Sequence, residues 1–318
     1  SKGNAKTDHF FNPMFKMVLT RKLSAYHSLL FSIATGSRAP LAENVYLSPR
    51  MRHTKQDTIR SEKIISAEWM YRFVSKKLHF RISAYCTLIQ DGMNVLTFYH
   101  DGYRNFVNYA IRGIDKRHTG IETGVAYILN ENWQIEMAAA VGDHRYISRQ
   151  QVTVSLDNNE FLLDKMDVYA KNFRVAGSPQ MVMGSGIQYR NPQAFFVRLN
   201  WNYFDQRWLD FNPVRRTYDA LQGVAYRSDH WNRIIHQTRL PSVILFNAFI
   251  GKGFSIKTGS SGKHIRYFCS LSIQNLLNER GMISGGYEQL RFDQENKNVD
   301  RFPPKLFFSP GLNYSVSI

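Results

Sequence analysis

The sequence predicts an all-β protein, an antiparallel transmembrane β-barrel to which this chain contributes about eleven strands. Three observations predict this fold class. Apolar and polar residues alternate with period two through nearly every segment that is not loop-like, as in a strand with two different faces. Short turn-like connections alternate with long polar loops along the chain. Aromatic residues make up 14% of the 318 residues, which suits a lipid-facing surface with interfacial aromatic rings.

Five segments show the alternation plainly, in chain order. From 65 to 73 the odd positions are Ile, Ala, Trp, Tyr and Phe, against Ser, Glu, Met and Arg. From 78 to 89 the even positions are apolar or Cys, against His, Arg, Ser, Tyr, Thr and Ile. From 133 to 141, 195 to 204 and 312 to 318, large apolar residues again alternate with polar or small ones. Each segment therefore presents one face to an apolar environment.

The complete set of predicted strands follows from the same periodicity, and helical signals are nearly absent. The segment 241–254 is the least regular, because Phe246 and Phe249 fall on opposite faces. The predicted strands lie near 13–21, 28–37, 63–74, 78–90, 114–129, 133–147, 180–190, 194–209, 241–254, 265–277 and 305–318.

The connections between these strands alternate in length. Short ones carry turn residues, at Ser75-Lys76-Lys77, Asn130-Glu131-Asn132 and Asn191-Pro192. Long ones cover roughly 38–62, 91–113, 148–179, 210–240 and 278–304. Soluble domains rarely contain several structureless loops of this length. Short turns at one end and long loops at the other are typical of a membrane barrel.

The composition is compatible with a membrane barrel and argues against nucleic-acid binding. No apolar run reaches the roughly 20 residues of a membrane helix, but a barrel hides its lipid face in alternation. The net charge is +16, with Lys and Arg spread along the chain and no nucleic-acid motif. An anionic membrane surface or an anionic ligand are the partners that this charge favours. Cys86 and Cys269 lie on apolar strand positions and are expected to be unpaired.

Six segments, taken in order, resemble landmarks of one family, the TonB-dependent outer-membrane receptors. The resemblance covers almost the whole chain. The Ile283–Gln289 segment, together with Asn202–Asp205 and Asn212–Thr217, is similar to the variant with an N-terminal carboxypeptidase-regulatory-like domain. The segments are Thr35–Pro40 followed by Glu62–Ile64, Gly113–Tyr127 with Gly120–Gly124 inside it, Asn202–Asp205, Asn212–Thr217, Ile273–Asn278 and Ile283–Gln289.

The resemblance implies a barrel of about 22 strands around a plug, of which 1–318 would form the C-terminal half of the wall. It places the short turns in the periplasm and the long loops outside the bacterium. The plug and its TonB-contacting segment are not in this chain. The last strand stops at Ile318 rather than at an outward-facing aromatic residue. An odd strand number also leaves the two chain ends at opposite rims. We therefore expect a sequence cut at both ends.

Two groups of side chains are candidate sites. Charges on the polar strand faces would line the lumen and hold a plug through ion pairs, or guide a substrate. Aromatic and Arg side chains in two long loops would form a ligand mouth, unless the loops pack on one another. The lumen candidates are Glu68, Arg72, Arg81, Glu122, Glu136 and Arg198, and the loop candidates are Tyr99, Tyr103, Arg104, Arg215, Arg216, Tyr218 and Trp231.

Metal and catalytic signals are weak. The segment Asp157-Asn158-Asn159-Glu160, with Asp164 nearby, has oxygen ligands suited to Ca²⁺ but lacks the loop spacing, so a solvated turn is expected. The histidines show no metal-binding spacing, and no nucleophile elbow or phosphate loop occurs. His79, Ser83 and Tyr85 share a predicted lumen face, whereas a lipase site would lie near the lipid edge. We expect no cofactor, no metal and no enzymatic activity.

The resemblance implies import of a scarce nutrient across the bacterial outer membrane, energised by the TonB complex acting on the plug. Two other hypotheses remain: a structural barrel subunit of a larger outer-membrane assembly, and a passive porin. A soluble β-sandwich is the alternative fold. Expected partners are the TonB energy-transduction complex, outer-membrane lipid and lipopolysaccharide, and a surface lipoprotein or other outer-membrane subunits. Loop composition does not name the substrate.

Overall fold

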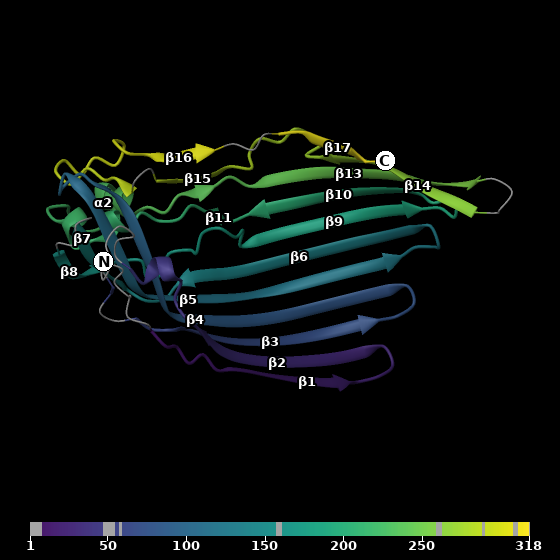
Figure 1. Cartoon of the computed structure of the whole chain (residues 1–318), viewed down its shortest axis with the longest axis horizontal. Coiled ribbons are helices and arrows are strands. Elements are labelled where there is room, and N and C mark those ends of the chain that lie inside the picture. The colour runs from purple at the N-terminus through teal and green to yellow at the C-terminus, as the bar shows by residue number, and fades with distance from the viewer. Residues whose placement is uncertain are drawn as a thin grey trace, which may run out of the picture.

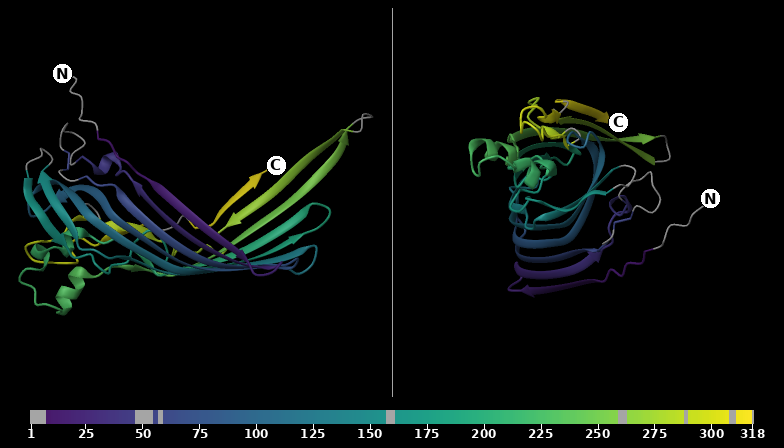
Figure 2. Two further views of the ribbon diagram at one scale, coloured as in Figure 1. Left: turned by 90° about the horizontal axis from the view of Figure 1, so that it is seen from below. Right: turned by 90° about the vertical axis from the view of Figure 1, so that its left-hand side faces the viewer.

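A computed structural model describes residues 8–46, 55–56, 59–156, 161–258, 263–287, 290–307 and 311–317. Over these residues, eleven antiparallel strands form one continuous curved wall, as the periodicity predicts (Figures 1 and 2). None of the described helices is both long and apolar enough to cross a membrane. In order, the wall contains β1 (Met14–Lys22), β2 (His27–Arg38), β3 (Glu62–Val74), β4 (Leu78–His100), β5 (Asn105–Ile128), β6 (Trp133–Tyr146), β9 (Met181–Arg190), β10 (Phe195–Asp205), β13 (Val243–Thr258), β14 (Lys263–Gln274) and β17 (Asn313–Ser317).

The wall has two chemically different faces, because neighbouring strands pair without shifting the alternation. Along β6, Trp133, Met137 and Val141 point to the convex side and are exposed. Their cross-strand partners on β5 and β9 are also mostly apolar, including Ile121 and Met181, which both pair with Val141. An exposed apolar surface that extends over so many strands would be unstable in water, so it is suited to lipid.

A row of aromatic side chains marks one edge of the apolar face, next to the short turns. The His27 and Phe73 rings lie 4.8 Å apart, and the Trp133 and Tyr189 rings also lie 4.8 Å apart. Phe195 continues the row, with its ring 6.4 Å from that of Tyr189. Amphipathic rings collect where a membrane meets water. This row therefore fixes one boundary of the lipid-facing band.

Charged side chains mark the opposite boundary. On the convex face of β5 and β6, Asp143 accepts from Arg145 at 2.7 Å and from Arg117 at 3.4 Å, and it also pairs with Arg174. Between this cluster and the aromatic row, β6 is apolar on this face from Trp133 to Val141. The eight steps between these nine residues, at about 3.3 Å each, cover roughly 26 Å of strand. The length suits the apolar band of a barrel.

The long loops are not structureless, which corrects the prediction for 91–113 and 148–179. Strands β4 and β5 continue to a tight turn at 101–104, and β7 (Gln150–Leu156) pairs with the outer half of β5. A further strand, β8 (Phe161–Val168), pairs with β7. In the outer half of β5, Val107, Asn108, Tyr109 and Ala110 are all buried. The two-residue alternation disappears where both faces of a sheet are covered, which is why the sequence analysis missed these strands.

Beyond the wall, the remaining loop segments fold around a hydrophobic core. We call this assembly the cap: the outer halves of β4 and β5, β7, β8 and the loop segments 169–180, 206–242, 279–287 and 290–307 (Figure 1). Its core residues come from all of these parts, including Phe98, Val152, Phe211, Ile234 and Phe292. The cap contains β11 (Arg207–Trp208), η2 (Pro213–Arg216), α1 (Tyr218–Leu221), α2 (Asp229–Ile235), β12 (Arg239–Leu240), β15 (Ser284–Tyr287) and β16 (Pro304–Phe307), while η1 (Ala42–Asn44) lies in the loop between β2 and β3.

Two register shifts in the β4–β5 ladder mark the boundary between the wall and the cap. The β4–β5 ladder shifts register between Ile89, Gly92 and Asn94, where Asp91 and Gly113 have positive φ angles of 59° and 66°. The predicted strand 305–318 is two elements. Its start, β16, pairs with β15 in the cap, and only β17 joins the wall.

Candidate functional site

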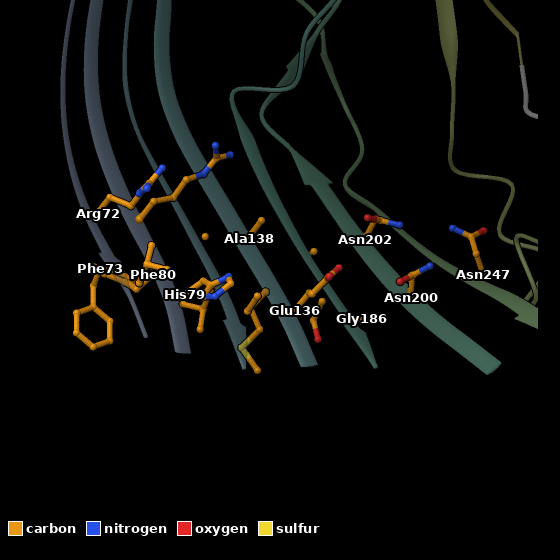
Figure 3. Close-up of a pocket in the computed structure, with 18 residues that line it drawn as sticks. Arg72, Phe73, His79, Phe80, Glu136, Ala138, Gly186, Asn200, Asn202 and Asn247 are labelled. Atoms are coloured by element: carbon orange, nitrogen blue, oxygen red, sulfur yellow. The ribbon is translucent and has the colours of Figure 1, made fainter. Parts of the chain in front are cut away.

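A groove of about 730 Å³ runs across the concave face from β3 to β13 (Figure 3). Its floor is formed by residues with little or no side chain, such as Gly124, Ala138 and Gly186. The neighbouring side chains lie over this floor: the Oδ1 of Asn200 is 2.4 Å from where a Cβ on Gly186 would stand. The concave face is therefore unusually smooth along β5, β6 and β9, so a flat surface could approach it closely.

All six predicted lumen residues lie on this concave face. Strand pairing sets Arg72 opposite Arg81 and Glu122 opposite Ser83. Glu136 accepts from Arg198 at 3.1 Å. Glu68, in register with Tyr85, completes the set. Since strand periodicity fixes the face of every residue, the sequence was sufficient to place these six side chains on one face.

Arg72 and Arg81 give one end of the groove a concentrated positive charge. They are direct cross-strand partners, and the structure gives neither guanidinium a carboxylate among the described residues. Like charges placed opposite one another on a sheet repel. Holding both here makes the groove attractive to an anionic group, on a plug or on a solute.

The other end of the concave face is rich in carboxamides and aromatic rings. A second groove of about 750 Å³ is lined by Gln188, Asn247, Gln274 and Asn313, among others. Beside it, the ring of Phe196 stacks on those of Phe249 at 5.1 Å and Phe268 at 5.7 Å. Carboxamides both donate and accept hydrogen bonds, so this end can bind neutral polar groups.

Three loop candidates lie together at the apex of the β4–β5 hairpin. Tyr103 and Arg104 are exposed on the turn, and Tyr99 is half-buried with its ring 5.6 Å from that of Phe106. The apex is held down by Asp101, whose carboxylate accepts from Nε of Arg291 at 3.0 Å. Tyr103 and Arg104 are therefore displayed on a fixed surface.

The structure places Arg215 and Arg216 inside the cap, not at a ligand mouth. Arg216 is 0% exposed and donates to the carbonyls of Asn212, Ile235 and His236 at 2.8–3.0 Å. Arg215 donates to the carbonyls of Val299 and Phe302 at 3.1 and 3.0 Å. Both guanidinium groups thus tie loop backbones together. Arg216 is closed to a surface ligand in this arrangement, and Arg215 is 5% exposed and lines a cavity together with Asp229 and His236. Loop-on-loop packing accounts for both.

The other two candidates in the 210–240 loop stay at the surface. Tyr218 is 63% exposed, and Trp231 is half-buried with its ring 5.2 Å from that of Tyr226. Each lies in the first turn of a short helix capped by a hydroxyl: Thr217 for α1 and Ser228 for α2. Tyr218 and Trp231 therefore remain available to a partner.

The calcium candidate lies outside the described residues, since 157–160 are not among them and the side chain of Asp164 is not described. In the part of the chain that the structure describes, no group of three or more His, Cys, Asp or Glu could hold a metal ion. Both cysteines are free. Sequence spacing did, however, miss a pair of histidines on adjacent strands, His118 and His144.

His100 gives the cap a predictable pH response. It lies at the apex, outside the lipid-facing band, 7% exposed, with its ring 4.6 Å from that of Tyr103. Burial lowers its pKa from the ordinary value of 6.5, and the charges of Asp101 and Asp219 offset only part of this. The neutral form is therefore favoured in the folded cap. Cap stability should be full above about pH 6.5 and decline as the pH falls from there to the lowered pKa.

The measurement is cap opening, followed by hydrogen exchange, between pH 7.5 and 5. His100→Gln keeps an acceptor for the Tyr103 N–H, which now bonds to Nδ1 at 3.3 Å, but removes the titration. We expect this variant to lose most of the pH dependence. The exposed His230→Gln is the matched control and should retain it. An unchanged profile in His100→Gln would contradict the assignment.

No protein-family model matches this chain, and no curated protein matches it in sequence. Among solved structures, the copper transporter OprC aligns with a TM-score of 0.56 at 15% identity, over 94% of this chain and 38% of that one. The FrpB iron transporter from Neisseria meningitidis (F5-1 variant, apoprotein form) gives a TM-score of 0.50 at 13% identity, over 96% and 38%. This chain thus spans about two fifths of the transporters that it matches. The likeness establishes the fold, that of the wall of an outer-membrane β-barrel.

Proposed function

We propose that this chain is the C-terminal half of the barrel of a TonB-dependent outer-membrane receptor that imports a scarce nutrient. The observation that carries the proposal is the two-faced wall. Its convex face is apolar between an aromatic row and a charged cluster, and its concave face is polar and grooved. The resemblance of six sequence segments to this receptor family, and the likeness to two metal transporters, support the same conclusion.

The proposed orientation puts the short turns in the periplasm and the cap outside the cell. Membrane barrels have short periplasmic turns and longer extracellular loops. The exposed Tyr103, Arg104, Tyr218 and Trp231 would then meet the ligand, or a surface lipoprotein, first. Lipid contacts the convex face, and phosphate groups of lipopolysaccharide fall near its charged rim.

In this proposal a plug from a preceding part of the parent protein occupies the concave face. Its carboxylates would pair with Arg72 and Arg81, and its flat surfaces would fit the glycine floor. In the variant that the sequence resembles, a carboxypeptidase-regulatory-like domain precedes the plug. TonB would move the plug, and the nutrient would pass through the lumen. No covalent step is part of the mechanism.

Import is tested by growth of a deletion strain on limiting iron chelates, copper, haem, cobalamin, peptides or glycans. We expect one of these to limit growth, and the defect to be reproduced when TonB is deleted. Normal growth on all of them contradicts an importer. A steady ion conductance in planar bilayers would then indicate a passive porin. A stoichiometric complex that survives purification would indicate a structural subunit.

A further inference from the structure

Three nitrogen and oxygen donors from three strands meet on the concave face, near the cap. His118 of β5 and His144 of β6 are direct cross-strand partners, and their rings lie 4.6 Å apart. The hydroxyl of Tyr85, on β4, lies 3.0 Å from Nε2 of His144. The sequence separates these residues widely, so only the strand register brings them together.

One donor of this cluster has no hydrogen-bond partner, and glycines make room for the other two. The Nε2 of His118 is shielded from solvent and has no hydrogen-bond partner among the described residues. A shielded polar atom without a partner is destabilising, and a bound ligand would satisfy it. The donor atoms of His144 and Tyr85 lie over glycines: a Cβ on Gly142 would stand 2.6 Å from Nε2 of His144, and one on Gly120 would stand 2.6 Å from the Tyr85 hydroxyl oxygen.

We propose that His118, His144 and Tyr85 bind a divalent transition-metal cation. Neutral imidazole is a preferred ligand of Cu²⁺, Ni²⁺ and Zn²⁺, and among these a nitrogen-rich site binds Cu²⁺ most tightly. Metal–imidazole bonds are about 2.0–2.1 Å long. The Tyr85 hydroxyl and Nε2 of His144, 3.0 Å apart, can therefore share one ion, and the adjacent ring of His118 offers a second imidazole. The site has positions left for water or a solute donor. It goes beyond the proposed import, because it requires no transport.

Nearby positive charge limits the affinity and supplies an independent test. Lys116 is the next inward-facing residue on β5, and its Nζ lies 5.6 Å from the centre of the Tyr146 ring. Arg174, also close by, is paired with Asp143. The ammonium group of Lys116 repels a bound cation. Replacing it with glutamine should therefore tighten metal binding.

The experiment uses the parent protein purified in detergent and titrated with Cu²⁺ as the probe, with affinity from chelator competition and ligand identity from electron paramagnetic resonance. We expect one tight site with the hyperfine pattern of two nitrogen ligands. His118→Gln or His144→Gln should weaken it at least about tenfold, since even outer-shell changes cost roughly 10–100-fold. Tyr85→Phe should weaken it less, and both Ni²⁺ and Zn²⁺ should compete less well than Cu²⁺.

His79→Gln is the matched control, because His79 lies on the same face of β4 without a histidine neighbour. It should leave copper binding unchanged, and Lys116→Gln should strengthen it. The proposal is overturned if His118→Gln/His144→Gln binds copper as tightly as the unmodified protein, or if Lys116→Gln weakens binding. Circular dichroism and heat-modifiable gel migration confirm that each variant is folded before titration. Because the readout is binding, a failure of import would leave this result intact.

Discussion

Replacing Arg216 with alanine is expected to open the cap while leaving the wall folded. The change removes a buried guanidinium that donates hydrogen bonds to three carbonyls. The Cζ of this guanidinium lies 4.3 Å from the centre of the Phe173 ring. Hydrogen bonds from a charged donor contribute about 1.5–3 kcal/mol each, and the carbonyls would be left without partners. We therefore expect the free energy of cap opening to fall by at least about 3 kcal/mol, or roughly a hundredfold in the opening equilibrium.

Hydrogen exchange of the amides between 209 and 240 measures this effect. Arg233→Ala is the matched control, because Arg233 is exposed and pairs with the exposed Asp300. A surface pair of this kind contributes at most about 1 kcal/mol. Arg216→Lys should resemble Arg216→Ala more than the unmodified protein, since one ammonium cannot replace a planar fork. Equal exchange in Arg216→Ala and Arg233→Ala would contradict a structural role for Arg216.

Replacing Leu199 with arginine should impair insertion of the barrel into a bilayer. Leu199 is 48% exposed on the convex face of β10, in the middle of its apolar row. A cation on the lipid face near the bilayer centre costs about 2–4 kcal/mol. The measurement is urea-dependent refolding of the parent protein into lipid vesicles. We expect the free energy of folding obtained from these curves to become less favourable by an amount in this range, with a lower urea midpoint.

The neighbouring Asn200→Arg provides the control, since it changes the charge one residue away on the concave face. There the new side chain points into the polar groove, and folding should be nearly unchanged. Similar losses in Leu199→Arg and Asn200→Arg would show that the convex face does not meet lipid. The pair of variants therefore tests the direction of every side chain on β10 at once.

The wall could be predicted from the sequence because one rule determines it. Residues such as Glu136 and Arg198 alternate with large apolar neighbours, so their face follows from position alone. The cap could not be predicted in this way. Around Asn108 and Tyr109 both faces of the sheet are buried, and the helices α1 and α2 are too short to show a helical period. Their order depends on contacts between distant loops.

The candidate site residues show the same difference: the sequence could place those in the wall but not those in the cap. From the sequence, Arg216 and Arg104 are both simply cations in long loops. Only the fold shows that Arg216 lies in the core of the cap and Arg104 on an exposed turn. The His118–His144 pair, in contrast, had a signal that spacing motifs do not capture. Counting outward from the turn at 129–132 pairs Ile128 with Gln134 and, ten residues later, His118 with His144. Hairpin register is therefore the better search for ligands in a sheet.

The β4–β5 hairpin also has a mechanical consequence. Both strands run without a break in the chain from the short turns to the apex, so any load on Tyr103 is carried directly into the wall. Regular pairing stiffens the ladder along most of its length. The hairpin therefore bends most easily where the register shifts beside Asp91 and Gly113. Any movement of the apex relative to the wall would therefore have to break the Asp101–Arg291 pair and bend the hairpin at this register shift.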